Sequence, residues 1–305
     1  MKVLIVARYK SNGFAPFITE QVAALEKAGV NCRFFGIKDN GILGYLRHLF
    51  SFREAIREFQ PDIIHAHYGL SGLFANYQRR VPVVTTYHGS DINDPRTLHF
   101  SRKSIRYSRF NIFVSPKNID IAKPKGDYAL IPCGINLDDF PLIDNNKACE
   151  VMGLNTSIKR VLFAGSFDNP VKNSAMAKEA IHLVPEAELL ELKGYSRPQV
   201  ANLMQAVDAL LLTSLNEGSP QVIKEALACG CPIVSVDVGD VKDLISGVDG
   251  CYIAERSATS VADNLKRAIA FSGRTNGRRV IEERGLTNEV IANKLIHIYN
   301  RIINR

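Results

Sequence analysis

The chain has 305 residues, of which 46% are hydrophobic and 23% are charged, and its formal net charge is +7. This composition is that of an ordinary globular protein, so disorder, collagen and coiled coil are excluded as descriptions of the whole chain. The length predicts two domains, and the first carries most of the positive charge, because residues 1–145 contain 19 Lys and Arg against 13 Asp and Glu.

The first half of the chain alternates short apolar runs with amphipathic helical patterns. Helices are predicted over residues 16–28 and 42–59, and strands over 3–7, 30–35, 62–65, 82–86, 111–115 and 128–131. Several of these strands are apolar throughout, which is typical of a parallel sheet with helices on both faces. The run at 3–7 is too short for the core of a signal peptide, so we expect a cytoplasmic protein.

The second half repeats this scheme after a segment, 132–156, whose Gly, Pro, Asp and Asn are typical of a linker. Strands are predicted at 160–164, 188–192, 209–213 and 232–236, and helices at 172–183, 197–206, 220–228, 257–271 and 287–305. The pattern predicts an α/β protein with two doubly wound, Rossmann-like domains, 1–145 and 146–286, facing across a cleft that holds the ligand. The last helix, 287–305, packs on its own domain or crosses back to the first.

The most informative segment is 216–225, which follows a predicted strand and opens a helix. Ser219 is a good N-cap, Pro220 a good first helical residue, and Gly218 lets a ligand approach the backbone. Free N–H groups at a helix start attract phosphate, whereas Glu217 and Glu225 suit sugar hydroxyls. The segment therefore predicts a nucleotide-sugar site, and the alternative is an ordinary capped helix with two solvated glutamates.

Two glutamates separated by seven residues at a helix start resemble the signature of the retaining glycosyltransferases of family 4, which have the GT-B fold. Further segments resemble this family in the same order along the chain: 11–14, 61–67, 87–91, 131–136, 161–165, Lys172, and 238–240 followed by Gly250. The chain departs from the family pattern at Ser166, where an arginine is usual, and in a second domain that is shortened after residue 192.

The resemblance implies roles for particular residues. It makes His88 and Glu217 catalytic, and it assigns acceptor binding to Asn12, Phe14, His65, His67 and Asp91. It assigns donor binding to Gly13, Ser166, Lys172, Gly218, Ser219, Pro220, Gln221, Val222 and Glu225. The residues alone leave other readings open, because His88 could cap a turn, and His65 and His67, on one face of a strand, could bind a metal or form a structural pair.

The sequence also leads to expectations about metals, cofactors and partners. No Asp-x-Asp motif occurs, so we expect metal-independent transfer, no metal site and no cofactor besides the donor substrate. The basic, apolar helix 42–59 suits an anionic membrane surface, although a helix packed on the sheet with solvated arginines is the alternative. No nucleic-acid motif accompanies the positive charge, so no nucleic-acid partner is expected.

The resemblance implies a retaining, hexosyltransferase-type enzyme that moves a sugar from a nucleoside diphosphate sugar to a hydroxyl of a glycan or lipid-linked glycan. Its place would be cell-surface polysaccharide synthesis, such as lipopolysaccharide or capsule assembly, in the cytoplasm or peripherally on the inner face of the membrane. Two alternatives remain: a nucleotide-sugar epimerase of the same fold, and a non-catalytic nucleotide-sugar-binding subunit.

Overall fold

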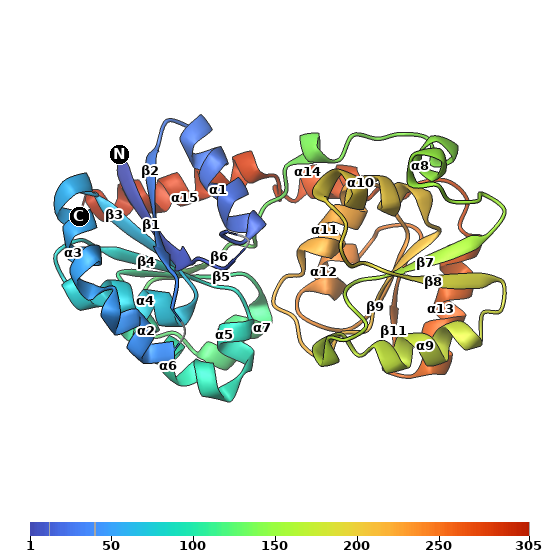
Figure 1. Ribbon diagram of the computed structural model, residues 1–305, viewed down its shortest axis with the longest axis horizontal. Helices are drawn as coiled ribbons and strands as arrows, with labels where there is room; N and C mark the ends of the chain where they lie inside the picture. Colours follow the sequence, from blue (N-terminus) through green and yellow to red (C-terminus); the bar gives the residue numbers. More distant parts are fainter. Residues whose placement is uncertain (12, 40, 305) are drawn as a thin grey trace. The chain divides into compact units, whose positions relative to one another are not determined.

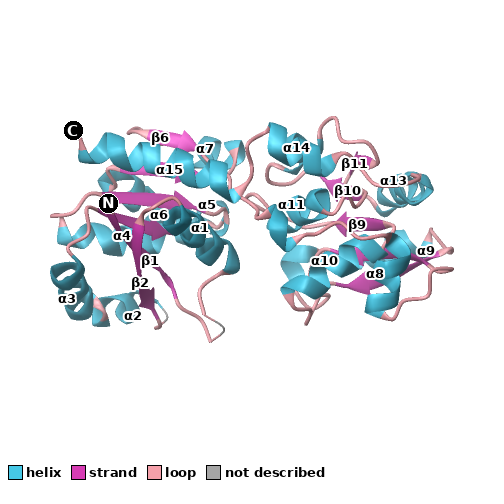
Figure 2. Cartoon of the chain, turned by 90° about the horizontal axis from the view of Figure 1, so that it is seen from above, coloured by secondary structure: helices cyan, strands magenta, loops and turns pink. Residues whose placement is uncertain are grey.

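The computed structural model describes residues 1–11, 13–39 and 41–304. The chain divides into two units, one formed by Met1–Gly134 with Asn288–Arg305 and the other by Ile135–Thr287. Each unit is a parallel sheet with helices on both faces, as the ribbons of Figure 1 and Figure 2 show. The predicted α/β architecture of two doubly wound sheets is therefore confirmed.

In the described residues, the first unit has six parallel strands in the order β2-β1-β3-β4-β5-β6. Their bounds are β1 Lys2–Arg8, β2 Asn31–Ile37, β3 Ile63–His67, β4 Val83–Tyr87, β5 Phe110–Phe113 and β6 Tyr128–Leu130. Alternate side chains of β1 enter different clusters, since Val3 and Ile5 pack on one face and Leu4 and Val6 on the other. Both faces of the central strand are thus covered, which explains its continuous apolar sequence.

The first unit has eight α-helices among the described residues, and one predicted helix is divided into two of them. Their bounds are α1 Pro16–Lys27, α2 Gly41–Arg47, α3 Leu49–Phe59, α4 Gly69–Ala75, α5 Ser90–Asn93, α6 Pro95–Tyr107, α7 Pro116–Ala122 and α15 Asn288–Ile303, with a 3₁₀ turn at Asn76–Gln78. The single helix predicted over 42–59 is divided at His48. The His48 N–H bonds to the carbonyl of Tyr45, three residues back, so the backbone tightens there and two helices result.

The boundary between the units lies before the predicted one. Ile135 and Phe140 are fully buried in the core of the second unit, and the Ile135 N–H bonds to the Leu286 carbonyl at 3.0 Å. The first unit therefore ends at Gly134 rather than at residue 145. The last helix, α15, packs against α1 and contributes Leu295 and Tyr299 to the core of the first unit.

In the described residues, the second unit has five parallel strands in the order β11-β10-β9-β7-β8. Their bounds are β7 Lys159–Phe163, β8 Ala187–Glu191, β9 Ala209–Leu212, β10 Ile233–Val236 and β11 Cys251–Ala254. The helices are α8 Asn145–Met152, α9 Ser174–His182, α10 Arg197–Ala206, α11 Gln221–Ala228, α12 Val241–Ile245, α13 Ala258–Ala270 and α14 Gly277–Glu283, with 3₁₀ turns at Leu137–Asp139 and Pro170–Lys172. Residues 192–196 alone connect β8 to α10.

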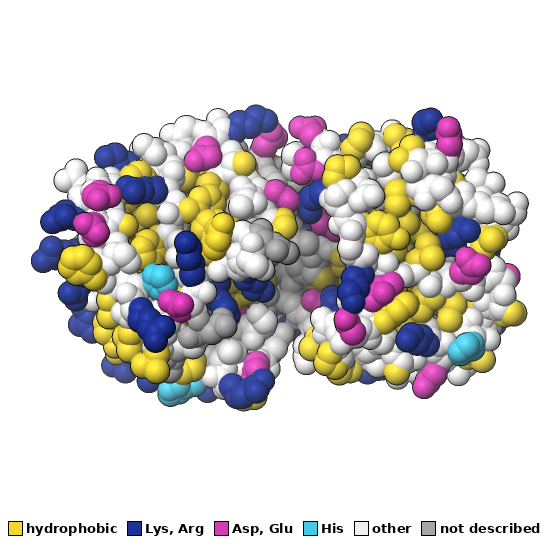
Figure 3. Space-filling view, in the orientation of Figure 1, with side chains coloured by type: hydrophobic (Ala, Val, Ile, Leu, Met, Phe, Trp, Pro, Cys, Tyr) yellow, Lys and Arg dark blue, Asp and Glu magenta, His cyan; other side chains and the backbone are white. Residues whose placement is uncertain are grey.

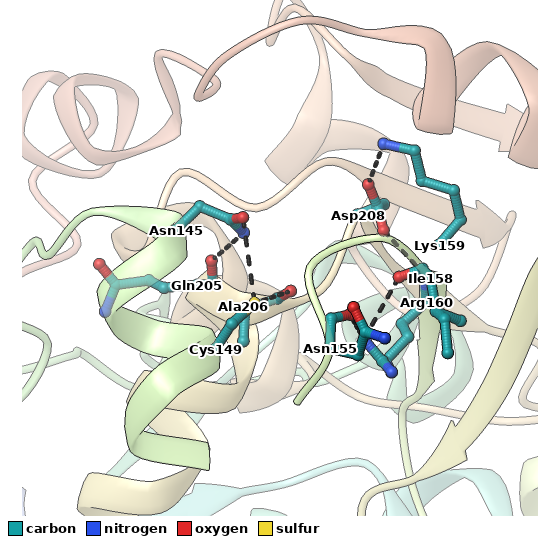
Figure 4. Close-up of polar contacts among 9 residues, drawn as sticks. All are labelled: Asn145, Cys149, Asn155, Ile158, Lys159, Arg160, Gln205, Ala206 and Asp208. Carbon is teal, nitrogen blue, oxygen red and sulfur yellow. Dashed lines mark hydrogen bonds and ion pairs between the residues drawn. The ribbon is translucent and has the colours of Figure 1, made fainter. Parts of the chain in front are cut away.

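From Ile135 onward, the segment predicted as a linker, 132–156, is folded into the second unit. Asn145 donates to the Gln205 carbonyl at 2.9 Å, and the buried Cys149 thiol lies 3.5 Å from the Ala206 carbonyl, so α8 is fixed to the end of α10 (Figure 4). Asp208 receives hydrogen bonds from the Lys159 ammonium and the Arg160 N–H, at 2.9 and 2.8 Å. These contacts join α8, α10 and the start of β7.

Among the described residues, no helix is long and apolar enough to cross a bilayer.

Candidate functional site

Lys172 and Glu217 meet at the point where the strand order of the second unit reverses. Lys172 follows β7 and Glu217 follows β9, and these two strands are adjacent in the sheet. The chain continues from β7 to β8 on one side of this pair and from β9 to β10 on the other side. Ligands bind at the carboxyl ends of strands at such switch points. Lys172 Nζ donates to Glu217 Oε1 at 2.6 Å, and the side chains are 20% and 17% exposed. The pair is thus mostly buried but reachable from solvent.

The backbone around Lys172 is held by contacts with the loop after β9. The buried Thr213 hydroxyl lies 2.9 and 3.0 Å from the carbonyls of Lys172 and Asn173. A side chain at Gly165 would come within 2.8 Å of Lys172 Cγ. The aliphatic part of Lys172 therefore lies directly on the Gly165 backbone, which fixes the position of its ammonium group.

Gly239 allows a second close approach, beside Glu217. It has a φ of +58°, and a Cβ there would lie 2.5 Å from the Gly218 carbonyl and 3.2 Å from Glu217 Cβ. Only glycine fits both the left-handed backbone and this space. The loop after β10 therefore supports the Glu217–Gly218 backbone from behind.

The start of α11 differs from the prediction at Ser219. Pro220 is the N-cap and has no side-chain cap, whereas Ser219 Oγ accepts from Lys224 Nζ at 2.9 Å. Lys224 is fully buried and also donates to Gln221 Oε1 at 2.8 Å. Burial raises the pKa of Asp240 to about 6, and the Lys224 charge opposes this. Sequence reasoning missed Lys224, because a lysine in an amphipathic helix normally lies in solvent.

Glu225 lies one turn into α11 and pairs with Arg197, the first residue of α10. Arg197 Nη1 donates to Glu225 Oε1 at 2.8 Å, and the guanidinium lies 5.0 Å above the centre of the Phe140 ring. Burial raises the pKa of Glu225, and Arg197 opposes this rise. Arg197 was not predicted as a site residue, and its helix-starting position gave no signal of this role. Gln221 and Val222 are half-buried in the first turn of the same helix.

Ser166 lies in the loop after β7, where its hydroxyl bonds to Asp168. The other carboxylate oxygen of Asp168 accepts from Lys193 Nζ at 2.8 Å. Both charged side chains are more than half exposed, so the pair lies at the surface. The loop that would carry the family arginine thus contains a hydroxyl and a solvated ion pair instead.

In the first unit, three histidines stack at the ends of β3 and β4. The rings of His65 and His67 are 4.6 Å apart, and those of His67 and His88 are 5.3 Å apart. His67 Nδ1 is hydrogen-bonded to His88 Nε2 at 3.0 Å, and His88 Nδ1 lies 3.6 Å from Cys133 Sγ. Within the described residues, His67 Nε2 is buried without a hydrogen-bond partner. His88 is half-buried, so it is the member of this row that solvent reaches.

His65 and His67, which the resemblance assigns to acceptor binding, are both fully buried. His65 Nδ1 is 2.5 Å from the Tyr299 hydroxyl, and His65 Nε2 is 2.8 Å from Thr86 Oγ1. Burial lowers the pKa of His65 to about 3 and holds that of His67 well below its ordinary value. Both are neutral side chains that support the core, which favours the structural-pair reading.

A pocket of about 840 Å³ in the first unit is lined by three of the remaining predicted residues. Gly13, Phe14 and Asp91 line it, and Asn12 lies outside the described residues. Asp91 is buried and accepts hydrogen bonds from the N–H groups of His88 and Gly89, at 2.9 and 3.1 Å. Burial raises its pKa to about 6, and these N–H groups oppose the rise. Asp91 thus fixes the turn that carries His88.

Both halves of the chain match known protein families. Residues 12–139 match the model of Glycosyltransferase Family 4, and residues 159–270 match that of Glycosyl transferases group 1. A putative teichuronic acid biosynthesis glycosyltransferase, TuaC of Bacillus subtilis, is 27% identical over 69% of this chain and 62% of its own length. The amylovoran biosynthesis glycosyltransferase AmsK of Erwinia amylovora is 26% identical over 69% and 62%. The chain therefore spans less than two thirds of the length of these relatives.

Solved structures share the fold at low sequence identity. Sucrose-phosphate synthase of Thermosynechococcus elongatus has a TM-score of 0.86 at 17% identity and covers 100% of this chain and 99% of its own. HepE of Anabaena in complex with UDP and glucose has a TM-score of 0.72 at 17% identity, with coverage of 99% and 100%. Each unit thus resembles one glycosyltransferase domain, and the sheets of both units show that the chain has the GT-B fold.

Proposed function

We propose that the chain is a retaining glycosyltransferase. It moves a sugar from a nucleoside diphosphate sugar to a hydroxyl of a glycan or lipid-linked glycan acceptor in cell-surface polysaccharide synthesis. The observation that carries this proposal is the grouping of Lys172, Glu217 and Glu225 around the start of α11 at the switch point of the second sheet. The names of TuaC and AmsK, both polymer-biosynthesis glycosyltransferases, support the class of product.

The donor fits this grouping by charge. Lys172 and the positive end of the α11 dipole attract the diphosphate without a metal. Glu225, oriented by Arg197, accepts hydrogen bonds from ribose hydroxyls. Glu217, on the other side of the helix start, accepts them from the transferred sugar. The likeness to HepE, solved with UDP and with UDP-glucose, supports a nucleotide sugar as the donor.

Retention follows from a reaction on a single face of the sugar. The bond from the anomeric carbon to the diphosphate oxygen breaks, the acceptor oxygen bonds to the same face, and the acceptor proton passes to the departing diphosphate. Glu217 stabilises the positive charge that develops on the sugar. The chain's main contributions are then charge stabilisation and positioning, and His88 positions the donor sugar.

The acceptor occupies the pocket of the first unit. Its lining combines the rings of Phe14, Tyr45 and Tyr68 with the cations of Arg8 and Lys10. Rings provide flat faces for sugars, and the cations suit a phosphate on the acceptor. The enzyme acts in the cytoplasm or at the inner face of the membrane, where lipid-linked acceptors are available.

The test is a panel of nucleoside diphosphate sugars, each incubated with and without a glycan acceptor. We expect a donor to raise the melting temperature, nucleoside diphosphate to be released only with acceptor, and the product to keep the donor's anomeric configuration by NMR. Donor conversion without acceptor would indicate an epimerase. Binding without turnover for any acceptor would indicate a binding subunit, and an inverted product would refute the retaining mechanism.

A further inference from the structure

The second unit contains a buried cation that the proposed reaction does not use. Figure 3 shows Lys and Arg side chains on the surface of both units, where long cationic side chains normally lie. Lys224 of α11 is instead fully buried. Taking an ammonium group out of water is unfavourable unless its hydrogen bonds are replaced within the protein. The contacts that replace them show what this lysine holds in place.

The partners of Lys224 lie at the start of its own helix. Its Nζ donates to Ser219 Oγ at 2.9 Å and to Gln221 Oε1 at 2.8 Å. These two residues flank Pro220, which is the N-cap of α11. One ammonium group therefore ties together both sides of the helix start, directly after the Glu217–Gly218 backbone.

The loop after β10 adds a buried carboxylate to this arrangement. Asp240 is 5% exposed and is hydrogen-bonded to the Ser219 hydroxyl, which accepts from Lys224 at the same time. Among the described residues, Asp240 Oδ1 is buried without a hydrogen-bond partner. The charges of Lys224, on α11, and Asp243, on α12, act on it in opposite directions. Because its pKa is about 6, Asp240 is charged above that pH and weakens the positive field of Lys224.

We propose that Lys224 is a positioning residue of the donor site: its ammonium group holds Ser219 and Gln221 at the start of α11 and adds a buried positive charge next to the diphosphate. The inference rests on the proposed function, because it assumes that the diphosphate binds at this helix start. A charge that is shielded from water acts more strongly than a solvated one. Ser166 stands where the family pattern has an arginine, so Lys224 supplies part of the positive field from within the fold.

The two charges of this network predict opposite effects on nucleotide affinity. Lys224→Met keeps the length of the side chain and should weaken nucleoside diphosphate about tenfold or more, with the nucleoside changed less than about twofold. Asp240→Asn keeps a partner for the Ser219 hydroxyl and removes the opposing charge, so at about pH 8 it should strengthen nucleoside diphosphate about threefold. A purely structural role would instead make both variants bind more weakly.

Isothermal titration measures these affinities, and the probes are UDP, GDP and ADP with uridine, guanosine and adenosine for comparison. In steady-state kinetics, Lys224→Met should raise the donor KM more than it lowers kcat, because its field acts on the diphosphate before and during transfer. The exposed Lys266 of α13 provides a matched control, and Lys266→Met should bind all six probes like the wild type.

Amide hydrogen exchange, measured without ligand, keeps this inference separate from the proposed function. If Lys224 holds the helix start, Lys224→Met should exchange about tenfold faster at residues 216–221 and at the wild-type rate in β9 and β10. Lys266→Met should exchange like the wild type throughout. Unchanged exchange at residues 216–221 in Lys224→Met would overturn the proposal.

Lys224→Met leaves Asp240 buried without its compensating cation, which destabilises the variant. The double variant Lys224→Met, Asp240→Asn removes both charges and should melt close to the wild-type temperature. It should still exchange quickly at residues 216–221 and bind nucleoside diphosphate more weakly than Asp240→Asn alone. Full recovery of exchange and affinity in the double variant would overturn the proposal, because Lys224 would then serve only to neutralise Asp240.

Two results from the titrations would also overturn the proposal. They are equal losses of nucleoside and nucleoside diphosphate affinity in Lys224→Met, and weaker nucleoside diphosphate binding in Asp240→Asn. A wild-type chain that binds none of the three nucleoside diphosphates would refute the proposed function and, with it, the donor role of Lys224. Faster exchange in Lys224→Met would still show, in that case, that Lys224 holds the helix start.

Discussion

Replacing Glu217 with glutamine keeps the shape of the side chain and removes its charge. In the chain as it stands, the Glu217 carboxylate and Lys172 ammonium are 2.6 Å apart, with side chains that are 17% and 20% exposed. Under the proposed function the diphosphate also needs Lys172, so carboxylate and ligand compete for one cation. We therefore expect Glu217→Gln to bind free nucleoside diphosphate more tightly and to transfer sugar more slowly.

The size of both effects follows from the geometry. A hydrogen bond between charged groups contributes about 1.5–3 kcal/mol, and partial solvent contact reduces what Lys172 regains to about 1 kcal/mol. Since 1.4 kcal/mol is a factor of ten, nucleoside diphosphate should bind about fivefold more tightly. Loss of one preorganised charge contact in the transition state lowers kcat by about 10²-fold or more.

Isothermal titration with nucleoside diphosphate and steady-state kinetics with the donor sugar measure the two quantities. Lys172→Met should weaken the diphosphate about tenfold or more while leaving the nucleoside unaffected, which checks that Lys172 is the cation concerned. Weaker binding of nucleoside diphosphate to Glu217→Gln would mean that Glu217 itself holds the nucleotide. Near-full turnover in that variant would refute its assignment to the reacting sugar.

Three further outcomes follow from buried contacts. Glu225→Gln and Arg197→Met should each weaken nucleoside diphosphate, and the double variant should show about 0.5–3 kcal/mol of coupling by calorimetry; additive losses would separate their roles. Tyr299→Phe leaves the buried His65 Nδ1 without its hydroxyl and should lower the free energy of unfolding by about 1–3 kcal/mol in denaturant titrations, whereas an unchanged midpoint would contradict this. Because burial lowers the pKa of His65 to about 3, and that of His67 well below its ordinary value, stability should fall as pH drops below about 6.5. Each histidine changes the free energy of unfolding by about 1.4 kcal/mol per pH unit in this range, and His67→Gln should remove one such contribution. An equal slope of unfolding free energy against pH in the variant and the wild type would contradict this prediction.

The sequence predicts the strands well where a run is apolar on both faces, as in β1 and β9. It does not predict β11, Cys251–Ala254, whose first three residues are only half-buried at the sheet edge and carry no alternating or continuous apolar pattern. The division at His48 is equally invisible, because it arises from one hydrogen bond that spans three residues instead of four. Local pattern therefore locates the elements, but it does not show where a helix is interrupted.

The candidate site also combines residues that the sequence predicts with residues that it does not. Lys172 and Glu217 are 45 residues apart, yet they meet because each follows one of two adjacent parallel strands, and this could be predicted from the pattern together with the family resemblance. Lys224 and Arg197 could not, since a lysine or arginine on a helix is normally solvated. Lys224 is fully buried and donates to Ser219 and Gln221, and Arg197, 29% exposed, is held by Glu225 of the next helix. Cations held in this way depend on neighbours that no local motif contains.

The histidine row connects residues that lie far apart in the sequence. His65, which the resemblance assigns to acceptor binding, is held by the Tyr299 hydroxyl, 234 residues further along the chain. Further along the row, His67 Nδ1 is hydrogen-bonded to His88 Nε2. The other ring nitrogen of His88, Nδ1, makes the longer contact, 3.6 Å, with Cys133 Sγ. A thiol is a weak hydrogen-bonding group. Because the Cys133 contact is the weaker of the two, a hydroxyl group that binds His88 would displace it before the hydrogen bond between His88 and His67.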